Sequence, residues 1–313
     1  MLPHKDIGVI RRGAITWWPF RLFPSRTGPD VPNSGRTTHF DMTSALCGQT
    51  KQGPVTAIDA IRAIVSDVDN TLLGNNESLE RFASWHSHSG GDCTLIYASG
   101  RFYDSIVKSI DTTALPEPDV VIGGVGTEVR AFPTGEPIGD WLSRFKDRFD
   151  AQAVVEALRR HPGLELQPEA CNSDFKVSFF LHDADPGDLF QVRLLLAEAS
   201  IDAELVYSSS RDLDVLPAGV NKGSAARFAI ESLGVRRDQV VVCGDSANDL
   251  SMFRHGFRGV VVGNAHEDLL ALSDANVHHA EQTYAAGVLE GLERWGATVL
   301  ESSERALVGA GSH

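Results

Sequence analysis

Short apolar runs recur along the chain, and each is followed by a turn and then by a stretch with helical spacing. The runs of strand length cover residues 61–66, 93–98, 119–122, 239–243 and 259–262. Helical stretches cover residues 78–87, 222–233 and 284–295, and others begin near residues 102, 248 and 266. Strands that are apolar throughout are buried on both faces, as in a parallel sheet covered by helices. The alternation therefore predicts an α/β fold with a Rossmann-like parallel sheet.

The pattern changes between these two halves, over residues 138–213. Amphipathic helices are predicted over residues 141–160 and 186–199. The strands predicted over residues 175–180 and 203–207 alternate between apolar and polar positions, which is typical of a sheet with one solvated face. We therefore expect a small α+β module inserted into the chain of the larger domain.

The two ends of the chain lack this patterning. Residues 1–58 are rich in Pro, Arg, Gly, Ser and Thr, and they contain the sequence Trp17-Trp18-Pro19-Phe20. Such a composition buries too little apolar surface to offset chain entropy, so we interpret the segment as a disordered extension. A docking arm and a misassigned start codon are the alternatives. The predicted domains are a core over residues 59–137 and 214–300, the inserted module over 138–213, and a tail over 301–313.

The formal net charge of −14 excludes a general nucleic-acid binder, because phosphate backbones need a basic face. An acidic protein that acts on a phosphate ester needs local positive charge, and a divalent cation is the obvious source. The four cysteines (Cys47, Cys93, Cys171 and Cys243) are far apart, which favours a reducing compartment without disulfides or zinc. No apolar run approaches the ~18–20 residues of a membrane span, so we expect a cytoplasmic protein with no membrane partner.

Two carboxylates and a threonine follow the first apolar run, in Asp67-Val68-Asp69-Asn70-Thr71. Parallel sheets bind their ligands beyond the carboxyl ends of the strands, where these residues are expected. A single acidic residue in this place is commonly a turn residue or a helix cap, but two acids with a threonine behind them favour chemistry.

Two further segments contain residues that suit an anion. Ser99-Gly100-Arg101 follows the second apolar run, and a serine with backbone N–H groups can hold an anion, although a helix cap is the simpler interpretation of the serine alone. Lys222 opens a predicted helix, where its charge opposes the helix macrodipole. Breaking that local rule suggests a function, and a solvated lysine is the alternative.

A second acidic segment, Gly244-Asp245-Ser246-Ala247-Asn248-Asp249, follows the strand predicted over residues 239–243. Hard oxygen ligands of this kind suit Mg²⁺, whereas helix capping explains only one of the two acids. Taken together, the four segments predict one phosphoryl-transfer site. Mg²⁺ and a lysine would offset the repulsion between a carboxylate nucleophile and a phosphoryl group, and a second acid would protonate the leaving oxygen.

The four ordered segments resemble the motifs of the haloacid dehalogenase-like hydrolases. The module inserted between the second and third motifs resembles a type IIB cap, and the resemblance covers about residues 60–297. Further segments resemble sucrose-phosphate phosphatases: Gly124-Val125-Gly126-Thr127-Glu128, Lys176-Val177-Ser178-Phe179, Asp212-Leu213-Asp214-Val215-Leu216-Pro217 and Ala285-Ala286-Gly287-Val288-Leu289-Glu290. Two more segments resemble bacterial mannosylfructose-phosphate phosphatases: Phe180-Leu181-His182-Asp183-Ala184-Asp185 and Tyr207-Ser208-Ser209-Ser210-Arg211-Asp212.

The resemblance implies a Mg²⁺-dependent phosphoric monoester hydrolase that acts on a disaccharide phosphate, such as sucrose 6-phosphate or mannosylfructose 6-phosphate. It implies that Asp67 is a nucleophile that forms an aspartyl-phosphate and that Asp69 is the general acid and base. Ser99 and Lys222 would hold the phosphoryl oxygens. The implied metal ligands are Asp67, Asp69 (through its backbone carbonyl), Asp245 and Asp249.

The remaining implied contacts are with the substrate. The expected residues are Thr71, Gly100, Arg101, Glu128, Lys176, Arg211, Asp212, Asp214 and Asn248. Of these, Lys176, Arg211, Asp212 and Asp214 lie in or beside the cap and are expected to contact sugar hydroxyls. The first motif usually has Gly where this chain has Asn70, and Asn tolerates the left-handed backbone better than most residues do.

Three alternatives remain open at this stage. The substrate could be another sugar or glycoside phosphate, such as glucosylglycerol phosphate or a hexose phosphate. The chain could be a phosphomutase, which would need a bisphosphate primer. It could also be a catalytically silent module that binds and regulates a sugar-phosphate synthase, although the intact pair of Asp67 and Asp69 argues against silence. For an active enzyme, the upstream sugar-phosphate synthase is a candidate partner, and the sequence leaves open whether it is bound.

Overall fold

A computed structural model describes residues 60–88 and 93–297 of the protein. The extension predicted over residues 1–58 and the tail predicted over residues 301–313 lie outside the described residues, as does Cys47.

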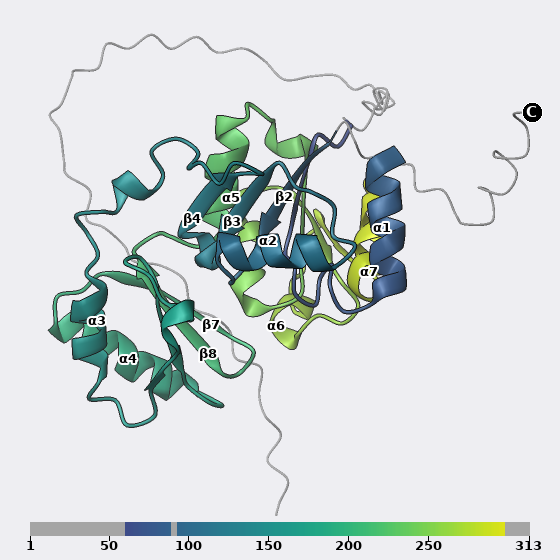
Figure 1. The fold of residues 1–313 in the computed structure, drawn as a ribbon. Helices are drawn as coiled ribbons and strands as arrows, with labels where there is room; N and C mark the ends of the chain where they lie inside the picture. Colours follow the sequence, from purple (N-terminus) through teal and green to yellow (C-terminus); the bar gives the residue numbers. More distant parts are fainter. Residues whose placement is uncertain (1–59, 89–92, 298–313) are drawn as a thin grey trace, which may run out of the picture. The chain divides into compact units, whose positions relative to one another are not determined.

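The larger of two sheets has seven strands in the order β11-β10-β9-β1-β2-β3-β4. Three of them, β2, β3 and β4, lie side by side in Figure 1. Its strands are β1 (Ala63–Ser66), β2 (Thr94–Ala98), β3 (Val120–Gly123), β4 (Glu128–Ala131), β9 (Val240–Gly244), β10 (Arg258–Val261) and β11 (Val277–His279). Every neighbouring pair is parallel except β3 and β4. β1 lies between β2 and β9, so that Val65 is opposite Ile96 on one side and Val242 on the other. The predicted parallel α/β core is confirmed.

Helices cover both faces of this sheet. They are α1 (Asn76–His88), α2 (Tyr103–Thr112), α5 (Lys222–Ser232), α6 (Glu267–Leu270) and α7 (Tyr284–Arg294). Successive residues of β1 point to opposite faces, and Ile64 packs with α1 and α7 while Val65 packs with α5. α1 and α7 lie side by side at the right of Figure 1. This double burial explains why the central strands are almost entirely apolar.

The smaller sheet has four antiparallel strands in the order β5-β6-β8-β7. Its strands are β5 (Glu165–Leu166), β6 (Val177–Phe180), β7 (Ala203–Ser208) and β8 (Asp212–Pro217). α3 (Ala151–Leu158) and α4 (Pro186–Glu198) share an apolar cluster with this sheet, and we call these six elements the cap. The expected α+β module is therefore present. β8 continues through the boundary predicted between residues 213 and 214, and the domain limits remain a prediction.

Two predicted helices are wrong. The helix predicted over residues 141–160 is a short 3₁₀ turn, Leu142–Arg144, followed by α3. Asp150 has extended backbone angles and its side chain accepts from the N–H of Ala153, so it caps α3 and interrupts the helical path. The helix predicted near residue 248 is replaced by the 3₁₀ turns Ala247–Asp249 and Met252–His255.

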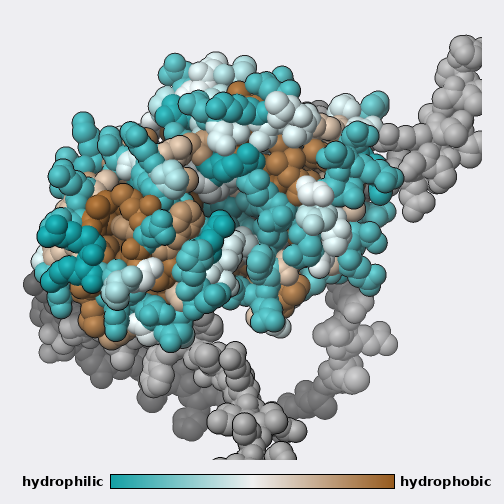
Figure 2. All heavy atoms as spheres, turned by 60° about the horizontal axis from the view of Figure 1, so that its bottom comes forward, coloured by the Kyte–Doolittle hydropathy of each residue, from teal (hydrophilic) through white to brown (hydrophobic). Residues whose placement is uncertain are grey.

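The surface of the cap includes several large apolar side chains. Figure 2 shows apolar atoms gathered at the left, on the side of the cap. Among the described residues, the exposed large apolar side chains of the cap are Leu166, Phe190 and Leu194. None of the helices in residues 60–88 and 93–297 combines the length and hydropathy needed to cross a bilayer. Cys171 and Cys243 are free thiols, and the Cys93 thiol donates to the carbonyl of Ile61.

Candidate active site

The polar segments identified in the sequence meet at the carboxyl edge of the large sheet. Asp67 follows β1, Ser99 follows β2, and Asp245 follows β9. β1 is the strand between the other two, so the residue after β1 has the residues after both neighbours beside it. The N–H of Asp67 donates to the carbonyl of Cys243 at 2.9 Å, which extends the pairing of β1 with β9 into the site.

Lys222 is the first residue of α5 and reaches this edge from the N-terminus of the helix. Asn221 precedes it as the N-cap and accepts from the N–H of Ser224. The Nζ of Lys222 lies 2.6 Å from Oδ1 of Asp67, 2.7 Å from Oδ1 of Asp249 and 2.9 Å from Oδ1 of Asn248. The lysine side chain is fully buried, so its three donors are all used inside the site.

The buried charges shift one another's protonation. Burial raises the pKa of Asp67 well above its usual value, and the nearby Asp249 and Asp245 act in the same direction against the attraction of Lys222. Burial and the neighbouring Asp249 raise the pKa of Asp245 to about 6. Burial alone would favour the neutral amine of Lys222, but Asp249 and Asp67 outweigh it and raise the pKa of that lysine. The cluster therefore has more carboxylates than one ammonium can neutralise.

Three of these carboxylates form a set that could hold a metal ion. Asp67, Asp245 and Asp249 are all buried, and each offers one oxygen within 4.8 Å of the others. Thr71 donates to Oδ1 of Asp245 at 3.3 Å, and the N–H of Asp245 donates to Oδ2 of Asp249 at 3.0 Å. A side chain at Gly244 would lie 2.6 Å from Cβ of Asp249, so glycine permits this close approach. Three hard oxygen donors at one point fit Mg²⁺.

Asp69 lies outside this set. Its carboxylate pairs with Nε of Arg101 at 2.8 Å, and its side chain is about half exposed (51%). The guanidinium is held in turn by Ser109 of α2, which accepts from Nη1 at 2.8 Å. Asn70, which lies between Asp69 and Thr71, has a φ of 60°, the left-handed conformation that an Asn side chain tolerates. The structure thus leaves the Asp69 carboxylate accessible beside the buried Asp67.

Ser99 is held by its own segment and by a tight loop after β3. Within its own segment, the Oγ of Ser99 accepts from the N–H of Arg101 at 3.1 Å. The N–H of Val125 donates to the carbonyl of Ser99, and Val125 has a φ of 59°, which is a strained conformation for a β-branched residue. The indole N–H of Trp141 donates to the carbonyl of Gly126 at 2.8 Å. The sequence marks this glycine-rich segment as one that resembles sucrose-phosphate phosphatases, but its support of Ser99 was not predicted.

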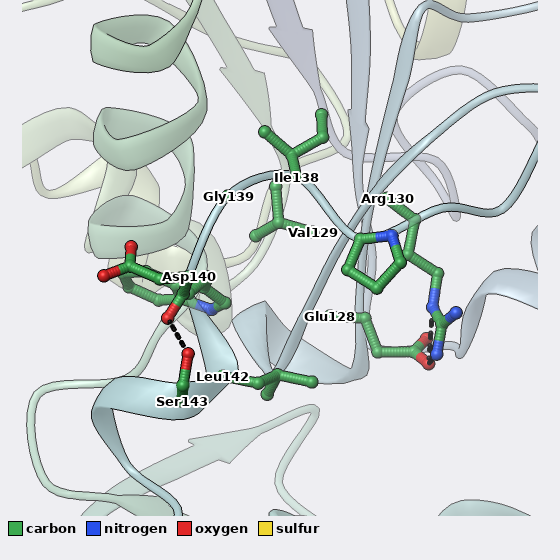
Figure 3. Close-up of a pocket in the computed structure, with 10 residues that line it drawn as sticks. Glu128, Val129, Arg130, Ile138, Gly139, Asp140, Leu142 and Ser143 are labelled. Atoms are coloured by element: carbon green, nitrogen blue, oxygen red, sulfur yellow. Dashed lines mark hydrogen bonds and ion pairs between the residues drawn. The ribbon is translucent and has the colours of Figure 1, made fainter.

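Glu128 has a local partner for each carboxylate oxygen. One oxygen accepts from the N–H of Tyr103 at the start of α2, and the other pairs with Arg130 at 3.1 Å. A cavity of about 170 Å³ lies beside it, between β4 and the segment that leads to the cap (Figure 3). Of the residues predicted to act on substrate, Glu128 alone is in the lining of that cavity.

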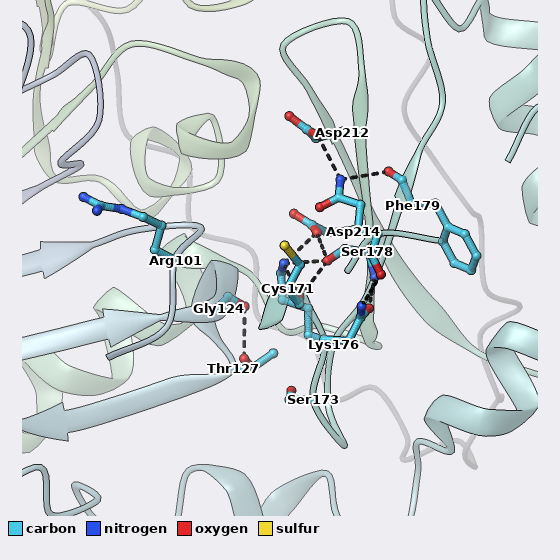
Figure 4. Close-up of polar contacts among 12 residues, drawn as sticks. Arg101, Gly124, Thr127, Cys171, Ser173, Lys176, Ser178, Phe179, Asp212 and Asp214 are labelled. Atoms are coloured by element: carbon cyan, nitrogen blue, oxygen red, sulfur yellow. Dashed lines mark hydrogen bonds and ion pairs between the residues drawn. The ribbon is translucent and has the colours of Figure 1, made fainter. Parts of the chain in front are cut away.

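The four residues expected to contact sugar form two ion pairs, and three of them, Lys176, Asp212 and Asp214, are shown in Figure 4. Lys176 and Asp214 form a buried ion pair at 2.9 Å, whereas Arg211 and Asp212 pair at 3.1 Å nearer the surface. The ammonium of Lys176 lies 5.6 Å from the ring centre of Phe102, the residue before α2. The inner pair is therefore the one that meets the core.

A model of the sucrose-6F-phosphate phosphohydrolase family matches residues 60–296, which is most of the chain. The chain belongs to this family. It is 37% identical over 241 residues to a mannosylfructose-phosphate phosphatase of Agrobacterium fabrum, an alignment that covers 75% of this chain and 97% of the relative. It is 33% identical over 251 residues to a probable sucrose-phosphatase of Arabidopsis thaliana, covering 74% of this chain but 59% of that longer protein.

Solved structures agree with this assignment. The sucrose-phosphatase of Synechocystis sp. PCC6803, solved with sucrose and phosphate, superposes with a TM-score of 0.71 at 29% identity and covers 76% of this chain and 99% of its own. The predicted haloacid dehalogenase fold, the sucrose-phosphatase-like family and the class of phosphoric monoester hydrolase are confirmed. The roles of the individual site residues remain predictions.

Proposed function

We propose that this enzyme hydrolyses the phosphate ester of a disaccharide phosphate, sucrose 6-phosphate or mannosylfructose 6-phosphate, with Mg²⁺ as its metal. The observation that supports the chemistry best is the buried ammonium of Lys222 between the carboxylates of Asp67 and Asp249. A lysine held between two acids has no role in packing an apolar core, but it suits a phosphoryl group next to a carboxylate nucleophile.

In the first step, an oxygen of Asp67 attacks phosphorus and the bond from phosphorus to the sugar oxygen breaks. Asp69 gives its proton to that leaving oxygen, so the sugar departs neutral and Asp67 is left as an aspartyl-phosphate. Ser99 and Lys222 hold the phosphoryl oxygens during the transfer. The partial exposure of Asp69 suits a group that must reach a leaving group outside the buried site.

In the second step, Asp69 takes a proton from water and the resulting hydroxide attacks phosphorus. The bond from phosphorus to Asp67 breaks, which releases phosphate and regenerates the carboxylate. Asp67, Asp245 and Asp249, with the backbone carbonyl of Asp69, would hold Mg²⁺. The metal, when bound, neutralises negative charge on the phosphoryl oxygens.

The cap is proposed to select the sugar. Lys176 and Asp214 present opposite charges at the face toward Phe102, and Arg211 and Asp212 form a second charged pair farther out. A buried polar pair rejects substrates that lack the matching hydroxyl, because it is then left unpaired. The names of the relatives support a disaccharide: one is a mannosylfructose-phosphate phosphatase, and the solved relative was crystallised with sucrose. Five further residues would support the phosphoryl end of the substrate: Thr71, Gly100, Arg101, Glu128 and Asn248.

The partner and the location of the enzyme are also proposals. A sugar-phosphate synthase must supply the substrate, and it is the protein partner we expect. A cytoplasmic location is consistent with the absence of a predicted membrane span in the sequence.

Phosphate release from a panel of esters tests the proposed function. The panel contains mannosylfructose 6-phosphate, sucrose 6-phosphate, glucosylglycerol phosphate and glucose 6-phosphate, each assayed with Mg²⁺, with EDTA and with the Asp67→Asn variant. We expect one disaccharide phosphate to exceed the other esters by orders of magnitude in kcat/KM, with no release in EDTA or by the variant. A preference for glucose 6-phosphate would refute the proposal that the substrate is a disaccharide phosphate. If the folded protein released phosphate from none of the four esters, a sugar-phosphate substrate would be refuted.

A further inference from the structure

Ser178 lies at the centre of the polar cluster that contains Lys176 and Asp214 (Figure 4). Its side chain is fully buried on β6, directly opposite Asp214 of β8 in the register of the sheet. Its Oγ lies 2.6 Å from Nζ of Lys176 and 2.6 Å from Oδ1 of Asp214. A polar group buried to this extent needs partners, and Ser178 has one charged partner on each side.

The chemistry of the three groups fixes the direction of each hydrogen bond. An ammonium only donates and an ionised carboxylate only accepts, so Lys176 donates to Ser178 and Ser178 donates to Asp214 at 2.6 Å. The carbonyl of Cys171 is a second and more distant acceptor, 3.1 Å from the same hydroxyl. The other two ammonium protons go to Oδ1 of Asp214 at 2.9 Å and to the carbonyl of Cys171 at 3.1 Å. Hydrogen bonds to charged groups are the strong ones, so the hydroxyl holds both charges in one arrangement.

The backbone of Ser178 is held as firmly as its side chain. Its N–H donates to Oδ1 of Asn172 at 2.7 Å, and the amide of Asn172 donates to the carbonyl of Gln167. The segment that presents the Cys171 carbonyl is therefore tied to β6 at the serine. Within the described residues, every hydrogen bond to the Asp214 carboxylate goes to Oδ1, which leaves Oδ2 to accept from a ligand.

We propose that Ser178 is a positioning residue for the sugar: it orients the Asp214 carboxylate so that Oδ2 is presented to a sugar hydroxyl. The inference rests on the proposed function, in which Lys176 and Asp214 contact the sugar. A carboxylate that is already oriented loses little side-chain freedom when the sugar binds. Without the hydroxyl, Asp214 must be ordered by the substrate itself, and the cost appears in the binding of the sugar and not in the chemistry at phosphorus.

The test compares Ser178→Ala with wild type on the best disaccharide phosphate and on p-nitrophenyl phosphate, which lacks a sugar. We expect the KM for the disaccharide phosphate to rise about 10- to 100-fold, the size expected for a lost hydrogen bond to a charged group. The kcat/KM for p-nitrophenyl phosphate should stay within about twofold. Ser208→Ala, which removes another buried hydroxyl of the cap sheet, is the matched control and should change neither value.

A double-mutant cycle with Asp214→Asn shows whether Ser178 acts through Asp214. If it does, adding Ser178→Ala to Asp214→Asn should raise the KM by less than threefold, because the oriented carboxylate is already gone. Fully additive effects, an unchanged KM in Ser178→Ala, or equal losses on both substrates would each overturn the proposal. If Ser178→Ala does not fold, Ser178→Cys, a weaker donor of similar size, replaces it in the same comparison. Failure of the proposed function would be visible beforehand, as wild type that releases no phosphate from either disaccharide phosphate.

Discussion

The ammonium of Lys222 lies 2.6 Å from a carboxylate oxygen of Asp67, although 155 positions separate the two residues in the chain. The same ammonium contacts Asp249, so one cation links the loop after β1, the loop after β9 and the start of α5. The stability of the fold and the proposed chemistry should therefore depend on the same side chain.

Replacing Lys222 with Met should abolish phosphate release and also destabilise the fold. The substitution keeps the volume but leaves Asp67 and Asp249 buried without their cation, which typically costs about 3–5 kcal/mol. Urea denaturation of the metal-free protein measures the loss. Arg227→Met on the exposed face of α5 is the control and should change the unfolding free energy by about 0.5 kcal/mol or less. A Lys222→Met protein as stable as wild type would contradict the inference that the buried pair supports the fold.

The two acidic residues after β1 should fail in different ways. Asp67→Asn removes the nucleophile and should be inactive on every phosphate ester. Asp69→Ala removes the proposed general acid and base but keeps Asp67, so an ester with a good leaving group should still phosphorylate Asp67. Rapid mixing with p-nitrophenyl phosphate should then show a burst of about one equivalent of p-nitrophenol, followed by turnover slowed roughly 100-fold or more. A burst from Asp67→Asn would refute the role of Asp67 as nucleophile. Equal steady-state rates for Asp69→Ala and wild type would refute the role of Asp69 as general acid and base.

Stabilisation by Mg²⁺ should depend on pH, because Asp245 must lose a proton to bind a cation. Burial raises the pKa of Asp245 to about 6, above the 3.8 of an exposed carboxyl. The protonated form therefore favours the folded state below pH 3.8, and this stability is lost as the pH rises through 6. The gain in melting temperature when Mg²⁺ replaces EDTA should thus be smaller at pH 5 than at pH 7.5. Asp245→Asn should gain little melting temperature from Mg²⁺ at either pH. An equal gain by wild type at both pH values would refute the competition between a proton and Mg²⁺ for Asp245.

Gly126 should not tolerate a side chain. Its φ is 105°, and a Cβ would lie 2.4 Å from the carbonyl oxygen of Asn221, immediately before Lys222. Gly126→Ala should lower the unfolding free energy by about 2 kcal/mol or more and reduce kcat, since the start of α5 must move. Gly219→Ala is the matched control: its φ is also positive, but no atom lies within 4 Å of the added Cβ, so about 1 kcal/mol is expected. Equal costs in urea denaturation would show that the contact with Asn221 relaxes freely.

Glu290 should contribute stability only above mildly acidic pH. Partial burial opposes its charge, but the backbone N–H groups of Gln282 and Glu281, together with His278, outweigh burial and lower the pKa of Glu290 below 4.5. A lowered carboxyl pKa stabilises the fold above the unfolded value of 4.5, and this contribution is lost as the pH falls through the folded value. Glu290→Gln should cost about 1 kcal/mol at pH 7 and less at pH 4. The exposed Glu293→Gln of the same helix should cost little at both.

The parts of the site at strand ends could be predicted because both signals are local. An apolar run marks the buried strand, and the acid or serine after it marks the edge, as at Asp67, Ser99 and Asp245. Strand pairing was harder to predict, because the local spacing of apolar residues indicates a strand or a helix but not the element that it contacts. The ion pair of Arg101 with Asp69 and the contact of Trp141 with Gly126 each depend on a residue distant in the chain. The helix predicted over residues 141–160 failed because one cap at Asp150 outweighed a plausible period.

The place of β1 between β2 and β9 has a consequence for how the enzyme is made. Ala63 pairs with Thr94, which follows soon after it in the chain, and also with Val240, which is synthesised only after the whole cap. Asp67, the proposed nucleophile, therefore leaves the ribosome long before Lys222 and Asp249, which lie beside it in the folded protein. A growing chain can complete half of the sheet and the cap early, but it must hold one side of β1 unpaired until the last third arrives. Chaperone binding and aggregation should accordingly concentrate in that interval of synthesis.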